Sequence, residues 1–201
     1  MKRRIGMTII GILLTGISAG IFRKAALGVD PFNCLSQGIE LLTGATATTV
    51  FAALMALFLV ITFFLGRKYI GLGTLLSLFM IGILIDCTLG VLNSLLPVMS
   101  LPARILLFVF GFVLMCFAAS LYMTADLGVS SYDAMALIAH DRIKKSSFRI
   151  CRITTDLICV TIGFLLHANI GIATVLTALC MGPLVQFFNH KIAQPLMEGK
   201  K

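Results

Sequence analysis

The chain has 201 residues, of which 59% are hydrophobic and only 12% are charged, and its formal net charge is +8. A soluble domain carries about 25% charged residues, so this chain cannot cover a globular surface with polar groups, and lipid must be its solvent. The positive charge does not indicate nucleic-acid binding. The basic residues lie in short runs between apolar segments, where the topology determinants of membrane proteins occur.

Six apolar runs are long enough to cross a bilayer, whose hydrocarbon core of about 30 Å requires about 20 residues of helix. The first run follows a basic start and so resembles a secretory signal. A similar segment, residues 110–123, lies in the middle of the chain and must be a structural helix, so we expect the first run to be retained as one too. We predict transmembrane helices at residues 5–24, 47–66, 69–96, 102–124, 149–166 and 169–188.

Two shorter and more polar segments, residues 31–42 and 131–141, each follow the first run of one half of the chain. A helix of about twelve residues is only about 18 Å long, which is too short to cross the membrane. The sequence LGVDPFN leads into the first segment and LGVSSYD into the second, and the glycine in each favours a tight turn. We predict two half-helices that either re-enter the membrane or lie flat in its interface.

Each half-helix has its own signal for a helix start. Asp30 is a capping residue, and Pro31 follows it at the first helical position. Ser130 and Asp133 have the spacing of a capping box. Different residues therefore predict the same helix start in both halves.

The chain repeats itself with a shift of 100 residues. Pairing residue n with residue n+100 needs no gap from Gly11 to Gly90, and it aligns Leu-Gly-Val, Phe-Leu and Ile-Gly-x-x-Thr in one register. We infer an internal duplication, with a first repeat at residues 1–98 and a second at residues 99–201. Because each repeat holds three spans, an odd number, we expect the second repeat to be inverted relative to the first.

The basic residues indicate which ends of the helices are cytoplasmic. With the N-terminus inside, twelve Lys and Arg residues lie on the cytoplasmic side, and Arg23, Lys24 and Arg104 lie outside. Counting the half-helices as full crossings leaves eleven inside and four outside, so six spans satisfy the positive-inside rule slightly better. We predict that both termini are cytoplasmic.

The polar residues at the two turns are candidates for a solute site, and they are Asp30, Asn33, Ser130, Ser131, Tyr132 and Asp133. A helix N-terminus carries roughly half a positive charge and favours an anionic group. The carboxylates of Asp30 and Asp133 offset part of that charge, so neutral and zwitterionic solutes are candidates as well. Helix capping is the simpler role for Asp30 and Ser130.

Ionisable side chains inside the apolar runs need a reason, because each costs about 2.5–3.5 kcal/mol on insertion scales. Asp86 lies deep in the third run, and its equivalent in the second repeat is Gln186. This pair either serves a cation, a proton or a polar solute, or forms hydrogen bonds to a neighbouring helix. Arg152 and Asp156 have the i,i+4 spacing of a salt bridge on one helix face. This pair is either a gate or a structural contact within the helix.

Other kinds of site are not indicated. The six cysteines and three histidines show no metal-ligand spacing, and the motifs of the common enzyme classes are absent. We therefore expect no metal, no cofactor and no enzymatic activity. Gly16-x-x-x-Gly20 permits close helix packing, either within the chain or in a homodimer.

The basic start, the LGVDPFN turn and the DLGVSSYDA turn with its following basic loop resemble the YczE/YyaS/YitT group of bacterial multipass membrane proteins. The similarity covers about residues 4–190. The resemblance implies an integral protein of the bacterial plasma membrane and transfers no catalytic residues.

Two functions stay open. Inverted repeats with interrupted helices favour a small transporter or channel for a polar solute, with its site where the repeats meet. The alternative is a membrane scaffold or regulator that acts through a partner, because polar groups in membranes also hold helices together.

Overall fold

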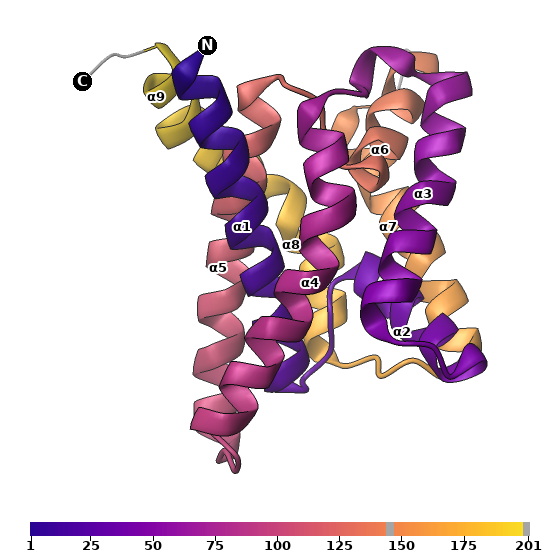
Figure 1. Cartoon of the computed structure of the whole chain (residues 1–201), viewed down its shortest axis with the longest axis vertical. Helices are drawn as coiled ribbons and strands as arrows, with labels where there is room; N and C mark the ends of the chain where they lie inside the picture. The colour runs from indigo at the N-terminus through magenta and orange to yellow at the C-terminus, as the bar shows by residue number, and fades with distance from the viewer. Residues whose placement is uncertain (144–146, 199–201) are drawn as a thin grey trace.

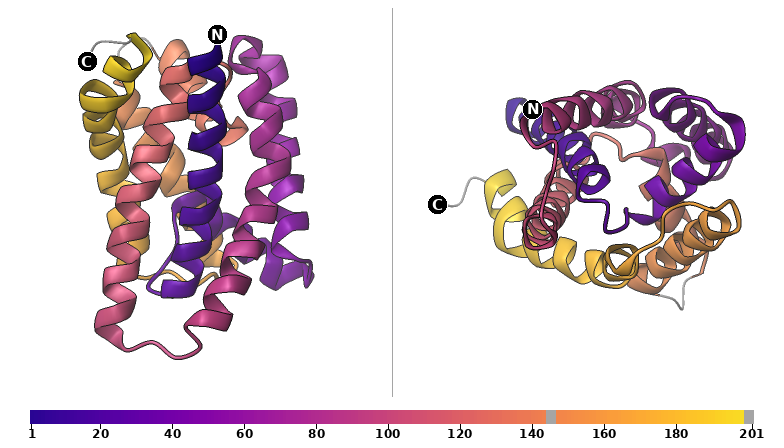
Figure 2. Two further views of the ribbon diagram at one scale, coloured as in Figure 1. Left: turned by 60° about the vertical axis from the view of Figure 1, so that its left-hand side comes forward. Right: turned by 90° about the horizontal axis from the view of Figure 1, so that it is seen from below.

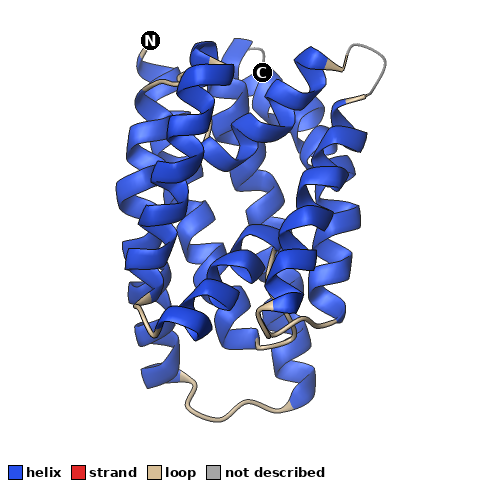
Figure 3. Ribbon diagram, turned by 90° about the vertical axis from the view of Figure 1, so that its right-hand side faces the viewer, coloured by secondary structure: helices blue, strands red, loops and turns tan. Residues whose placement is uncertain are grey.

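The computed structural model describes residues 1–143 and 147–198, and this part of the chain contains helices and connections but no strand (Figure 3). The prediction of an all-α polytopic membrane protein is confirmed. The helices are α1 (Lys2–Ala25), α2 (Pro31–Thr43), α3 (Ala47–Leu65), η1 (Arg67–Tyr69), α4 (Leu72–Leu95), α5 (Leu101–Ala125), α6 (Ser131–Arg142), α7 (Phe148–Leu165), α8 (Ile172–Phe188), η2 (Asn189–Ala193) and α9 (Gln194–Glu198).

Five helices of the described chain are long and apolar enough to cross a membrane: α1, α3, α4, α5 and the continuous segment Ile172–Glu198. The sixth expected span, residues 149–166, forms α7, which has 18 residues. Three of these residues, Arg149, Arg152 and Asp156, are charged. Two of the three are buried inside the bundle, where they contact other polar side chains, as described below.

The two halves of the chain run in opposite directions. In Figure 1, α1 descends, α3 ascends and α4 descends, whereas α5 ascends, α7 descends and α8 ascends. The N-terminus and α9 therefore lie at the same end of the bundle, the upper end of Figure 1. The predicted boundary between the repeats falls in the connection between α4 and α5, at the lower end.

The two short helices lie inside the bundle rather than flat on its surface. From the lower end, the chain after α1 runs toward the middle of the ring of helices, where α2 begins (Figure 2, right). The chain after α5 enters from the upper end in the same manner, and α6 then leads back upward (Figure 1). Both short helices pack against α3 and α7. They are half-helices that enter the bundle from opposite ends.

Turn chemistry explains how each half-helix begins. Gly28 and Gly128 have φ angles of 120° and 94°, a backbone conformation that side chains with a Cβ rarely adopt. The side chain of Asp30 then accepts a hydrogen bond from the Asn33 amide, and Ser130 caps α6 in the same way. The predicted N-caps at Asp30 and Ser130 are confirmed, whereas the Asp133 carboxylate contacts the Ser130 hydroxyl and not the backbone amide that a capping box would engage.

The small residues of α1 serve packing within the chain. A Cβ at Gly16 would lie 2.5 Å from the Cβ of Leu84, and a Cβ at Gly20 would lie 2.6 Å from that of Thr88. Both neighbours belong to α4. The two glycines therefore let α1 and α4 approach closely, which is the first of the two roles considered for this motif.

Candidate functional site

The N-termini of the two half-helices meet in the centre of the bundle. The rings of Phe32 and Tyr132, which are equivalent positions under the 100-residue shift, have centroids 4.9 Å apart. A small cavity of about 50 Å³ lies beside them. We call it the central cavity, and its polar lining consists of Thr15, Asp30, Asn33, Tyr122, Ser130, Tyr132, Asp133 and Arg152.

Asp133, at the start of α6, is held by three donors. The hydroxyl of Ser130 donates a hydrogen bond to its carboxylate at 2.7 Å. The hydroxyl of Tyr122, on α5, and the guanidinium of Arg152, on α7, donate to the same carboxylate. The side chains of Asp133 and Arg152 are less than a tenth exposed, so this ion pair joins α6 to α7 away from solvent.

Arg152 also binds Asp156, one turn later on α7, with an Nε–Oδ1 distance of 3.3 Å. The hydroxyl of Tyr132 donates to Asp156, and the guanidinium carbon of Arg152 lies 4.8 Å from the centre of the Tyr132 ring. The expected i,i+4 contact is thus formed, but as part of a buried network that includes α6. Its role as a gate stays a prediction.

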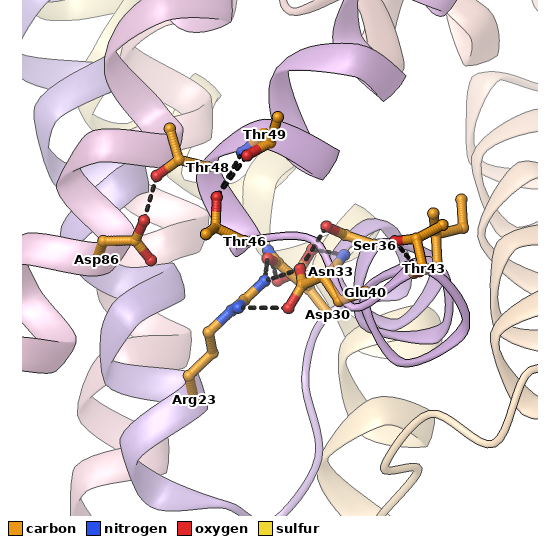
Figure 4. Close-up of polar contacts among 11 residues, drawn as sticks. Arg23, Asp30, Asn33, Ser36, Glu40, Thr43, Thr46, Thr48, Thr49 and Asp86 are labelled. Atoms are coloured by element: carbon orange, nitrogen blue, oxygen red, sulfur yellow. Dashed lines mark hydrogen bonds and ion pairs between the residues drawn. The ribbon is translucent and has the colours of Figure 1, made fainter.

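The first half has its own network, which Figure 4 shows. Arg23, near the end of α1, contacts both carboxylate oxygens of Glu40 at 2.8 and 3.1 Å and the amide oxygen of Asn33 at 3.3 Å. The Asn33 side chain donates to Asp30 at 2.7 Å. The Asp30 carboxylate accepts hydrogen bonds from the backbone amide and the side-chain amide of Asn33, and it has no ion pair in the described chain.

The charge count used Arg23 as an outside charge, but its side chain is only 8% exposed and is paired with Glu40 inside the bundle. Sequence analysis also missed Tyr122. Its equivalent in the first half is Phe22, which has no hydroxyl. This difference between equivalent positions could have identified Tyr122 as a polar residue of the site. The pairing of Arg23 could have been predicted from Glu40, an acidic residue on the half-helix that follows.

The turns of each half are bound by the other half. The amide of Gly73 donates to the carbonyl of Leu127 at 2.8 Å, and the amide of Ala173 donates to that of Leu27 at 3.2 Å. Thr74 donates to the carbonyl of Val129 at 2.7 Å. These contacts join each Leu-Gly-Val turn to the Ile-Gly-x-x-Thr helix start of the opposite half. Both motifs recur in the sequence because each is needed twice.

Two of the larger cavities lie at opposite ends of the bundle. The wide cavity, of about 820 Å³, is at the lower end beside residues 26–29 and 169–173. The narrow cavity, of about 260 Å³, is at the upper end beside residues 68–72 and 126–129. The two sets of lining turns are equivalent under the 100-residue shift, but the cavities differ about threefold in volume.

An ion pair stands beside the narrow cavity. Lys68 Nζ lies 2.5 Å from a carboxylate oxygen of Asp141, and the Tyr69 hydroxyl donates to the same oxygen at 2.6 Å. The hydrogen bond from Lys68 lowers the pKa of the Asp141 carboxyl below its usual value. The equivalents of Lys68 and Asp141 at the lower end are Ala168 and Leu41, so this ion pair has no counterpart there.

Three candidate residues do not line the central cavity. Asp86 is exposed on α4 and receives a hydrogen bond from Thr48 (Figure 4). Gln186 is exposed on α8. Helix periodicity explains Asp86, because Ile81 and Ile85 of α4 are buried and the next residue is rotated by about 100°. Ser131 is buried, and its hydroxyl has no partner in the described chain.

The described residues offer no metal site, since no three of their His, Cys, Asp or Glu side chains are grouped closely enough to hold an ion. The arrangement provides hydrogen-bond donors and acceptors, two carboxylates (Asp30 and Asp133) and one arginine (Arg152) around a small space. It can bind a polar group.

The chain is similar to three bacterial proteins over most of its length. The chain is 29% identical over 196 residues to an uncharacterized protein of Haemophilus influenzae, with 96% of this chain and 86% of the relative covered. It is 26% identical to the uncharacterized protein YyaS of Bacillus subtilis, with 89% of each covered. The uncharacterized membrane protein YczE of the same organism is 27% identical, with 88% of this chain and 80% of YczE covered.

No solved structure matches the chain significantly. The resemblance to YyaS and YczE is confirmed, and together with the five apolar helices it identifies a multipass membrane protein. A family of unknown function, DUF6198, matches residues 2–190. The chain belongs to the DUF6198 family.

Proposed function

We propose that the protein is a small transporter or channel for a polar solute, which binds in the central cavity. The observation that carries this proposal is the meeting of two half-helix N-termini, from opposite ends of the bundle, at a buried group of polar side chains. Interrupted helices that meet near the middle of the membrane form the sites of many transporters built from inverted repeats. In this proposal the two halves arose by duplication and inversion.

The charges around the central cavity favour a neutral or zwitterionic solute, or one that carries a cationic group. Arg152 is already paired with Asp133 and Asp156, so it has little attraction left for an anion. Asp30 lines the same cavity, accepts hydrogen bonds from Asn33 and forms no ion pair within the described residues. A cationic group of a solute would find its partner in Asp30.

The two outer cavities are the expected routes to the central cavity. They lie at equivalent places on opposite ends but differ in volume. In alternating access, a transporter in one conformation is open to one side of the membrane and closed to the other, and the difference in volume is consistent with such a state. The ion pair of Lys68 and Asp141 stands at the narrower route. In this proposal the structure is open to the lower end.

The orientation that we propose places the upper end in the cytoplasm of a bacterial cell, at its inner membrane. Eight described basic residues that we expected inside belong to helices and turns of the upper end, whereas Lys24 and Arg104 lie at the lower end. The other four, Lys144, Lys145, Lys200 and Lys201, lie outside the described residues. This asymmetry is the one that the positive-inside rule favours.

A ligand screen with two matched variants tests the proposal. The purified protein is heated with ions, amino acids, nucleobases, vitamins and organic acids, since a ligand that binds the folded state raises its stability by about 2.7 kcal/mol at one hundred times its dissociation constant. Asp30→Asn keeps a capping side chain but removes the charge in the central cavity. Asp86→Asn removes an exposed charge elsewhere and is the control.

We expect a solute that raises the melting temperature of the unmodified protein and of Asp86→Asn, but not of Asp30→Asn, and that enters proteoliposomes containing the protein. Equal shifts in all three proteins would place the binding outside the central cavity. No shift with any compound, together with no uptake, would contradict the proposal and favour a scaffold that acts through a partner.

A further inference from the structure

The buried network around Arg152 contains more acidic than basic groups. Asp133 and Asp156 both contact its guanidinium, and all three side chains are less than a tenth exposed. One guanidinium neutralises only one of the two carboxylates, so the fully ionised network would hold an excess negative charge away from solvent. Such a charge is strongly unfavourable in the protein interior. The network therefore favours a ligand with one positive charge.

The helices around Asp156 supply no second cation among the described residues. Arg23, on α1, is already paired with Glu40. Of the described helices packed against α7, α8 has a single titratable side chain, Cys180. The remaining titratable groups near Asp156, apart from Arg152, are Asp30 and Cys34 of the first turn, Tyr132 and Asp133 of α6, and Cys159 of α7.

Asp156 is the less well supported of the two carboxylates. Asp133 accepts hydrogen bonds from three donors, as described above. Asp156 Oδ1 accepts one from the Tyr132 hydroxyl and lies 3.3 Å from Arg152 Nε, whereas Asp156 Oδ2 is inaccessible to solvent and has no partner within the described residues. An ionised carboxylate carries its charge on both oxygens, so a bare buried oxygen disfavours the ionised form. The positive ligand therefore belongs on Asp156.

A proton fits this place, and a larger cation does not. Metal ions such as Mg²⁺ and Ca²⁺ need about six or more oxygen ligands. In the part of the chain that the structure describes, no three acidic, His or Cys side chains are grouped to hold one. A proton needs neither space nor further ligands, and two carboxylates that share a buried site commonly hold one proton between them.

The Tyr132 hydroxyl connects Asp156 to the central cavity. Tyr132 lines this cavity, and its hydroxyl contacts Asp156 Oδ1. A polar cavity of about 50 Å³ has room for about one water molecule. A hydronium ion there can give a proton to the Tyr132 oxygen while Tyr132 passes its own hydroxyl proton to Asp156 Oδ1. Asp156 becomes neutral, Tyr132 keeps one hydroxyl proton, and water remains in the cavity.

The first half shows that the fold can join a half-helix to its neighbour without such a network. Phe32, the equivalent of Tyr132, packs on Phe51 and Phe58 of α3 with ring centroids 5.0 and 6.0 Å apart. Apolar side chains in place of a buried ion pair are often neutral or favourable for stability. The charges of the second half therefore call for a role other than folding.

We propose that Asp156 binds a proton near neutral pH and exchanges it with the central cavity through the Tyr132 hydroxyl. Arg152 and Asp133 remain an ionised pair, so the network as a whole is neutral. This site stands apart from the proposed transport, because neither its evidence nor its measurement requires a solute. In a transporter it would place an exchangeable proton beside the solute site.

Infrared spectroscopy of the protein in lipid bilayers tests the proposal. A protonated carboxylic acid has a C=O stretching band that ionised carboxylates lack and that shifts in heavy water. Asp156→Asn has the shape of the neutral acid and should fold normally, which its melting temperature checks, but it should lose the Asp156 band. Asp86→Asn removes an exposed carboxylate and is the control, in which the band should remain.

Two further variants test the network without changing Asp156. Asp133→Asn frees Arg152 to pair with Asp156 alone, so Asp156 should ionise and the band should disappear. Tyr132→Phe is compatible with the fold, since Phe32 occupies the equivalent position. It should keep the band but slow its shift in heavy water at least about tenfold, because the positioned proton donor is gone.

An unchanged band in Asp156→Asn, or no acid band in the unmodified protein near neutral pH, would overturn the proposal. Persistence of the band in Asp133→Asn would contradict the charge balance on which it rests. Exchange in Tyr132→Phe as fast as in the unmodified protein would rule out the route through the hydroxyl.

Discussion

The two half-helices have the same backbone arrangement but anchor their polar groups differently. In the second half, Arg152 of α7 pairs directly with Asp133 at the start of α6. In the first half, Arg23 of α1 pairs with Glu40 near the far end of α2, and the charge at the helix start, Asp30, has no arginine partner. The two half-helix starts thus share a backbone arrangement, while their side chains make the site asymmetric.

This difference assigns separate roles to the two halves. The carboxylate and arginine of the second half satisfy one another and hold α6 against α7. The first half leaves one carboxylate beside the central cavity with hydrogen bonds only. We therefore propose that Asp30 is the group available to a solute.

Removing the arginine of the second half should have the largest effect on stability. Arg152→Ala leaves Asp133 and Asp156 buried without a cation, and loss of one partner of a buried ion pair costs about 3–5 kcal/mol. Chemical unfolding in detergent micelles measures the change. Arg149→Ala, one turn earlier and exposed, is the control and should alter stability by less than about 0.5 kcal/mol.

The corresponding change in the first half should cost less. Arg23→Ala leaves Glu40 without its partner, but Glu40 is 17% exposed and can reach water, so we expect a loss of about 1.5–3 kcal/mol. Adding Glu40→Gln should recover part of it. A loss for Arg23→Ala as large as that for Arg152→Ala would show that the two networks are equivalent, against the comparison drawn above.

The contacts between the halves should be sensitive to a single methyl group. A Cβ at Gly171 would lie 1.9 Å from the Leu27 carbonyl oxygen, and one at Gly71 would lie 2.3 Å from that of Leu127. Each change to alanine should cost about 1–3 kcal/mol, because the facing turn must move. Gly90→Ala meets no atom within 4 Å and should be neutral or slightly stabilising in the same unfolding assay.

The smallest effect should be a pH dependence at the upper end. Because the pKa of Asp141 is lowered in the folded state, its ionised form contributes stability above the ordinary carboxyl pKa, and this contribution disappears as the pH falls through the folded value. The difference in melting temperature between the unmodified protein and Asp141→Asn should therefore shrink to zero in acid. A difference that grew on acidification would contradict this pairing.

The sequence was sufficient for the elements and their starts. Apolar length located five of the six expected spans, and the Leu-Gly-Val turns with Asp30 and Ser130 located the half-helices, because these signals are local. It also brought together Asp30, Asn33, Ser130, Tyr132 and Asp133, all of which line the central cavity, whereas Arg152 was expected only as a partner of Asp156. Their grouping was foreseeable because both turns were expected at the centre of an inverted repeat.

Features that depend on helix rotation or on distant contacts were not foreseeable. Asp86 is deep in its span by residue number, yet its side chain lies on the exposed face of α4. Arg23 lies at a helix end, as topology charges do, and only the path of α2 shows that Glu40 neutralises it. The bonds between the turns and the opposite helix starts join residues more than 50 positions apart, which no local pattern reveals.

The most direct measurement of the central claim, that half-helices enter from opposite sides, is thiol labelling in intact cells. In a chain whose six cysteines are replaced, one cysteine is introduced at Ala45, after α2, or at Ser147, before α7; both positions are exposed. An impermeant thiol reagent should label Ala45→Cys in intact cells and Ser147→Cys only after permeabilisation. Labelling of both positions from the same side would contradict the inverted arrangement and, with it, a site between two opposed half-helices.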